Sequence, residues 1–163
     1  MESGSPKKNM EKGKSYTLAF DRIALAIENG FPLEAITMEE SIISDRLRAY
    51  CEANGMEWKK KHAGLGEVIE KVQADPKNNN PELQSLCMEI DAWRKQRNNF
   101  LHGIVKTRHA GDEPDVLSDD FVEQAMIYAE KGKGYARKIC DLSKKMRRER
   151  EKHSVPPASQ AQV

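Results

Sequence analysis

"PELQSLCMEIDAWRKQRNNFLHG", residues 81–103, is the stretch that decides the fold. Its apolar residues recur every three or four positions, which is the spacing of one face of an α-helix. At about 100° per residue, this face gathers one set of side chains: Leu86, Ile90, Trp93, Phe100, Leu101 and Ile104. Asn80 suits the N-cap, Pro81 the first helical position and Gly103 the end of the helix. A helix with such a face must bury it against other helices.

The rest of the chain has the same helical period. Gly30 and Gly55 each end a periodic segment, and Ser118 suits the N-cap of a long last helix, which we expect Gly132 and Gly134 to bend or weaken. The predicted segments, besides 81–103, are 16–32, 33–54, the region around 65–72 and the stretch from 119 onward. Since no strand pattern or internal repeat is found, the sequence predicts an all-α bundle of about five helices.

Composition indicates one domain with charged ends. The 163 residues suit a single compact unit, 33% of them are charged, and the net charge is +1. Residues 15–143 hold 17 basic and 22 acidic residues, whereas both ends are basic. We therefore expect a flexible N-terminal tail over 1–14, a helical domain over 15–146 and a flexible C-terminal tail over 147–163. Solvated tails are the first interpretation of these ends, and nucleic-acid-binding arms are the alternative.

Cysteine and histidine usage bears on location and cofactors. The three cysteines lie far apart in helix-like stretches, which favours a reducing compartment over a disulfide framework. The first residues have no apolar core, and no run approaches the roughly 20 apolar residues of a membrane span. A cytoplasmic protein without a membrane anchor is expected. The four histidines are not at metal-binding spacing, so no metal and no cofactor are predicted.

Arg97 lies in the middle of the apolar face of the 81–103 segment. Burying a lone guanidinium is strongly unfavourable, so Arg97 must meet a carboxylate, a partner subunit or a bound anion. A purely structural interpretation pairs Arg97 with Glu40 or Asp45 of the second helix. In that interpretation His102 caps the last carbonyls of its own helix.

A functional interpretation starts from the charges around His102. Residues 92–111 contain no Asp or Glu. Because this stretch contains Lys and Arg but no acidic residue, it is a candidate binding site for phosphate. Histidine can serve as acid or base near neutral pH, and arginine can stabilise charge that builds up at phosphorus. The predicted substrate-binding residues are Arg94, Lys95, Lys106 and Arg108.

The segment "RNNFLH", residues 97–102, resembles the Arg-x-x-x-x-His motif of HEPN domains. The resemblance implies an up-and-down helical bundle that forms a homodimer, with a composite site where the two motifs face each other. By this resemblance Arg97 would bind the phosphate, His102 would act as general acid and base, and Asn98 would orient them. Some members have tyrosine two residues after the histidine, where this chain has Ile104, which leaves the subfamily open.

Two functions follow from this resemblance. The first is a metal-independent endoribonuclease that acts on RNA in phage defence or a toxin–antitoxin system, with an antitoxin or defence protein as partner. The alternative is a catalytically inactive helical scaffold that binds nucleic acid or a protein. Only the nuclease requires Arg97 and His102 to be accessible and close together.

Overall fold

The computed structural model describes residues 6–56, 63–76, 78–106 and 119–154. Its elements are the helices α1 (Pro6–Glu28), α2 (Pro32–Ala53), α3 (Leu65–Gln73), α4 (Pro81–Lys106) and α5 (Asp119–Ser154). No strand occurs within these ranges. The prediction of an all-α bundle of about five helices is therefore confirmed.

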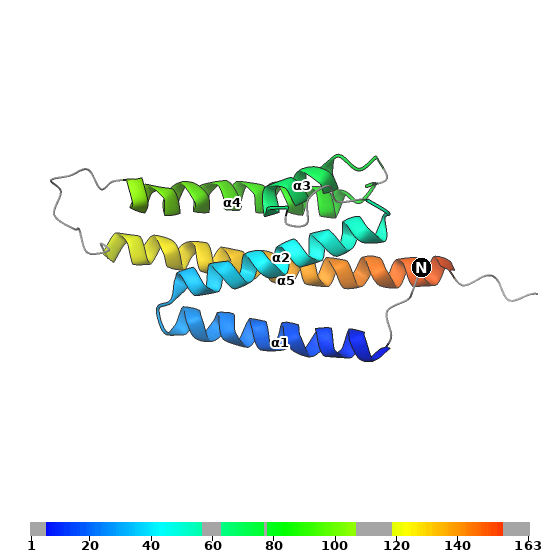
Figure 1. The fold of residues 1–163 in the computed structure, drawn as a ribbon, viewed down its shortest axis with the longest axis horizontal. Helices are drawn as coiled ribbons and strands as arrows, with labels where there is room; N and C mark the ends of the chain where they lie inside the picture. The colour runs from blue at the N-terminus through cyan, green and yellow to red at the C-terminus, as the bar shows by residue number, and fades with distance from the viewer. Residues whose placement is uncertain (1–5, 57–62, 77, 107–118, 155–163) are drawn as a thin grey trace, which may run out of the picture.

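The helices lie side by side in an elongated bundle (Figure 1). α2 and α5 form the most extensive helix pair, and α1 packs against both of them. On the opposite side α4 packs against α5, while α3 fills the space between α2 and the N-terminal half of α4. The backbones of α2 and α4 do not approach each other directly. A long side chain bridges these two helices, since Arg97 of α4 donates a hydrogen bond to Glu40 of α2.

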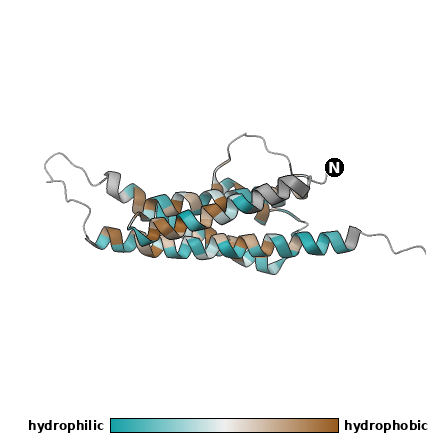
Figure 2. Ribbon diagram, turned by 90° about the horizontal axis from the view of Figure 1, so that it is seen from below, coloured by the Kyte–Doolittle hydropathy of each residue, from teal (hydrophilic) through white to brown (hydrophobic). Residues whose placement is uncertain are grey.

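The core runs along the centre of the bundle, and hydrophilic residues dominate the C-terminal part of α5 (Figure 2). The largest fully buried apolar side chains come from all five helices: Trp93, Ile23, Ile36, Ile43, Leu47, Ile69, Leu83, Ile90, Ile139, Val68 and Val72. Leu18 of α1 is 66% exposed, although most of the apolar residues of this helix face the other helices. No helix of the described ranges combines the length and the apolar character needed to cross a membrane.

Several helix ends are formed as the sequence indicates. The Oδ1 atom of Asn80 accepts a hydrogen bond of 3.0 Å from the backbone N–H of Leu83, so Asn80 is the N-cap of α4. Gly30 and Gly55 have positive φ values of 76° and 72°, the left-handed conformation that ends a helix with glycine. Ser118 lies outside the described residues. Gly103 does not end α4, which continues to Lys106.

The first and last helices are longer than the predicted helical domain. α1 begins at Pro6 although 1–14 was predicted to be a tail, and α5 continues to Ser154 although the domain was predicted to end at residue 146. Proline fits the first position of a helix, and Lys, Arg and Glu are good helix formers. Charged segments of this kind can therefore prolong a helix that packing has already nucleated, without burying apolar surface themselves.

Candidate functional site

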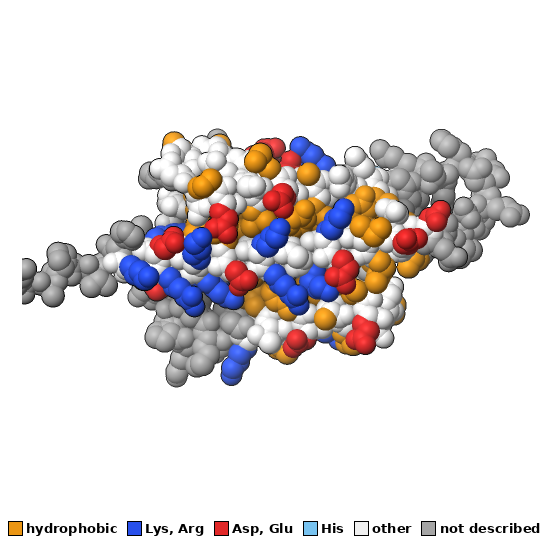
Figure 3. All heavy atoms as spheres, turned by 180° about the vertical axis from the view of Figure 1, so that it is seen from behind, with side chains coloured by type: hydrophobic (Ala, Val, Ile, Leu, Met, Phe, Trp, Pro, Cys, Tyr) orange, Lys and Arg blue, Asp and Glu red, His pale blue; other side chains and the backbone are white. Residues whose placement is uncertain are grey.

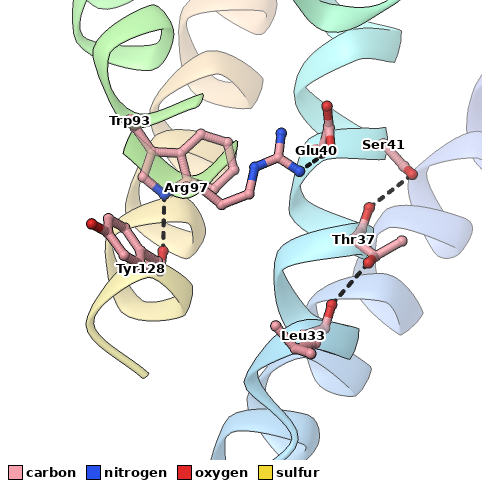
Figure 4. A network of polar contacts seen from close by, with 7 residues as sticks. All are labelled: Leu33, Thr37, Glu40, Ser41, Trp93, Arg97 and Tyr128. Carbon is pink, nitrogen blue, oxygen red and sulfur yellow. Dashed lines mark hydrogen bonds and ion pairs between the residues drawn. The ribbon is translucent and has the colours of Figure 1, made fainter. Parts of the chain in front are cut away.

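Arg97 is buried inside the protomer, where it connects α4 to α2 (Figure 4). Its Nη1 atom donates a hydrogen bond of 2.6 Å to Oε2 of Glu40. Its guanidinium also lies 5.4 Å from the ring centroid of Trp93, and its Nε atom is buried without a hydrogen-bond partner. The structural interpretation anticipated Glu40 or Asp45 as the partner, and the partner is Glu40. Asp45 instead accepts hydrogen bonds from Tyr16 and Arg46.

The aromatic side chains of α4 fix the surroundings of Arg97. The indole N–H of Trp93, a residue that is 2% exposed, donates a hydrogen bond of 3.0 Å to the backbone carbonyl of Tyr128 in α5. One turn beyond Arg97, the ring of Phe100 stacks on Phe121 with a centroid separation of 4.7 Å. These contacts attach the C-terminal half of α4 to α5.

The three predicted catalytic residues are not brought together. Arg97 is 7% exposed, whereas Asn98 is half-buried and His102 is exposed. Within the described residues no hydrogen bond or ion pair joins Arg97 to His102 or Asn98. Because α4 continues to Lys106, His102 lies within the helix and does not cap its last carbonyls.

The predicted substrate-binding residues of α4 are largely neutralised by an acid just outside the acid-free stretch. Asp91 pairs with both Arg94 and Lys95 at 2.7 Å. Burial would raise the pKa of the Asp91 carboxyl, but hydrogen bonds from Lys95 and Arg94 hold it below its ordinary value. The guanidinium of Arg94 also lies against Gly66 of α3. The structure does not describe the side chain of Lys106, and Arg108 lies outside the described residues.

The N-terminal part of the apolar face of α4 is covered by other helices of the same chain. Leu86, Ile90 and Trp93 are at most 5% exposed. Arg97 has found its carboxylate in the same chain. An arginine on the apolar face of α4 therefore needs no second subunit to explain it.

The sequence interpretation missed Glu39, whose side chain is fully buried. A signal was available, because Glu39 follows Ile36 by three residues and precedes Ile43 by four, which places it on the apolar face of α2. Gly132 of α5 was expected to bend or weaken its helix, but α5 is continuous there. A Cβ atom on Gly132 would lie 2.1 Å from Oε2 of Glu39 and 2.7 Å from Cζ2 of Trp93. The glycine is thus required by close packing.

Basic residues are concentrated in α5 from Lys131 onward. Residues 131–152 contain ten Lys or Arg and three Asp or Glu, a formal charge of +7 on a chain whose total is +1. Figure 3 shows Lys and Arg side chains along a central band of the molecule, with acidic ones between them. We name these exposed cations the α5 basic surface: Lys131, Arg137, Lys138, Lys144, Lys145, Arg147, Arg148, Arg150 and Lys152.

Within the described ranges no group of three or more His, Cys, Asp or Glu side chains is arranged to hold a metal ion. Comparison with known proteins gives no match: no family model, no curated protein and no solved structure is significantly similar to this chain.

Proposed function

We propose that this chain is a helical module that binds RNA through the α5 basic surface without cleaving it. The observation that carries this proposal is the formal charge of +7 on residues 131–152 of one helix, where nine of the ten basic side chains are exposed. A phosphate backbone is the polyanion that such a surface attracts, and the attraction does not depend on base sequence. Arg97 has no part in this binding, because it is buried with Glu40.

The acids near the α5 basic surface do not prevent it from binding phosphate. Lys145 pairs with Glu82 at 2.9 Å and Lys144 with Asp141 at 3.1 Å, and all four side chains are at least 59% exposed. Exposed ion pairs of this kind contribute little to stability, because water and salt screen them. A phosphate group can therefore replace the carboxylate at little cost.

Neutralising one stripe of the α5 basic surface is expected to weaken RNA binding by about tenfold or more at low salt. Lys144→Gln, Arg148→Gln and Lys152→Gln, made together, remove cations that repeat every four residues on one side of α5. Fluorescence anisotropy with a labelled single-stranded RNA measures the dissociation constant at several salt concentrations. The slope of log K against log salt should decrease by about 0.7 for each phosphate that the variant no longer neutralises.

The matched control removes the same charge elsewhere, through Lys14→Gln, Arg22→Gln and Lys95→Gln, all at exposed positions. This control should bind RNA like the wild type. The proposal is wrong if both triple variants lose the same affinity, because the binding would then follow net charge and not the α5 basic surface.

The second candidate function is metal-independent cleavage of RNA, as the HEPN resemblance implies. Its specific support is the exposure of His102, which would let its ring reach a phosphate, with Asn98 one turn earlier on the same side of α4. For this function, Arg97 must break its ion pair with Glu40. The resemblance also implies a homodimer, in which two copies of the motif form one composite site. A defence or toxin–antitoxin partner belongs to the same candidate.

A cleavage assay separates the two candidates. Under the binding proposal, the wild-type protein leaves RNA intact in EDTA while shifting it in a gel, and light scattering shows no obligatory dimer. Cleavage that survives EDTA, leaves a 2′,3′-cyclic phosphate and is lost in His102→Ala would establish the nuclease instead.

A further inference from the structure

Glu39 of α2 is a buried carboxyl group without a hydrogen-bond partner. The residue is 0% exposed, and neither Oε1 nor Oε2 is hydrogen-bonded within the described part of the structure. A buried carboxylate in this situation is strongly destabilised, because it has lost its hydration and gained nothing in return. Holding a proton removes the charge and most of this penalty.

The carboxyl group of Glu39 lies where α2, α4 and α5 meet. The missing side chain of Gly132 leaves the space that the carboxyl and the Trp93 ring occupy, because a Cβ there would be 2.1 Å from the former and 2.7 Å from the latter. The contact between α2 and α5 is also the most extensive in the bundle. The charge state of Glu39 therefore acts directly on the central helix pair.

The charged groups near Glu39 are already engaged elsewhere. From α5, Lys133 and Glu130 act on its carboxyl, but they pair with each other at 2.7 Å. Arg97, which follows Trp93 by one turn on α4, is held by Glu40 at 2.6 Å. Burial raises the pKa of Glu39 to about 8, with Lys133 opposing this effect and Glu130 adding to it. Among the described residues, no cation is bonded to the carboxyl.

We propose that Glu39 is a proton-operated switch in the packing of α2 against α5. With a proton on Glu39, the neutral carboxyl fits over Gly132 and the helices pack closely. When the proton leaves to solvent, the carboxylate needs either water or a cation. It obtains these if α2 and α5 separate locally, or if Lys133 leaves Glu130 and turns toward Glu39.

The sign of the pH effect follows from the raised pKa. The folded state holds the proton up to about pH 8, whereas an unfolded glutamate releases it near its ordinary pKa of 4.5. The stability that protonated Glu39 contributes is therefore fully present below the unfolded pKa of 4.5. It is lost as pH rises through the folded pKa of about 8. Across this window the unfolding equilibrium constant should rise by up to about tenfold per pH unit.

Urea unfolding of the full chain at several pH values tests the switch. The wild type should lose stability as pH rises from about 5 to about 8, and Glu39→Gln should lack this component because it cannot ionise. Glu52→Gln, which alters an exposed glutamate of the same helix, is the matched control and should keep the wild-type slope. A Glu39→Gln protein with the wild-type slope would overturn the proposal.

Two measurements on folded protein test the switch if Glu39→Gln fails to fold. Titration of the glutamate side-chain carboxyl ¹³C signals of the wild type should reveal one group with a transition near pH 8. In a Trp58→Phe background, the fluorescence of Trp93 should change over the same range, because its ring lies at the carboxyl. If every glutamate titrates near its ordinary pKa and the fluorescence stays constant, Glu39 is not a switch.

Discussion

Replacing Gly132 by leucine is expected to destabilise the protein by about 3 kcal/mol or more, a large share of the stability of a small domain. Even the first added carbon would lie 2.1 Å from Oε2 of Glu39 and 2.7 Å from Cζ2 of Trp93. The carboxyl ends a flexible side chain, but the residue is 0% exposed, so the carboxyl cannot move aside into solvent without opening the helix packing. The Trp93 ring is fixed by its hydrogen bond to Tyr128. Chemical unfolding measures the loss.

Gly134 provides a control on the same helix, two residues away. Its Cβ position has nothing within 4 Å, so the first added carbon of Gly134→Leu has open space around it. Leucine favours a helix over glycine by about 0.5 to 1 kcal/mol, and this variant should therefore be at least as stable as the wild type. Equal destabilisation by both substitutions would show that the contact with Glu39 is not what makes Gly132 sensitive to a side chain.

These two glycines also show how far the sequence could predict the fold. Local signals gave the helices and several of their ends, because the chemistry of Asn80, Gly30 and Gly55 acts within a few residues of each. The local signal of Gly132 is the same as that of Gly134, and both were expected to bend the helix. What distinguishes them is the helix that faces Gly132, and this depends on tertiary packing that no local pattern contains.

The sequence also predicted only part of the candidate site. Because Arg97 lies on an apolar face, the sequence predicted that it is buried and that it needs an acidic or anionic partner. Glu40 was one of the partners considered. The choice among a carboxylate, a second subunit and an anion depends on which helix crosses α4, and the sequence left it open. Glu39 was missed because only apolar residues were used to define the buried face of α2. Glu39 has the same helical spacing as Ile36 and Ile43 and could have been assigned to that face.

Replacing Arg97 by methionine is expected to destabilise the protein by about 1 to 3 kcal/mol, because it leaves the Glu40 carboxylate without its partner. This loss is smaller than that for a fully buried pair, since the Glu40 side chain is 31% exposed and water can reach it. Lys95→Met is the control: the Lys95 side chain is 65% exposed, and the loss should stay within about 0.5 kcal/mol. Urea unfolding at neutral pH measures both.

A double-mutant cycle with Glu40→Gln separates the ion pair from the loss of a long side chain. If Arg97 is a structural bridge between α4 and α2, its coupling to Glu40 should be about 1 kcal/mol, within the range of residues in direct contact. The double variant would then be more stable than the sum of the single effects predicts. If Arg97→Met keeps wild-type stability while it abolishes an EDTA-resistant RNA cleavage, the buried pair is dispensable. Arg97 would then be a group that acts on the phosphate, as the HEPN motif implies.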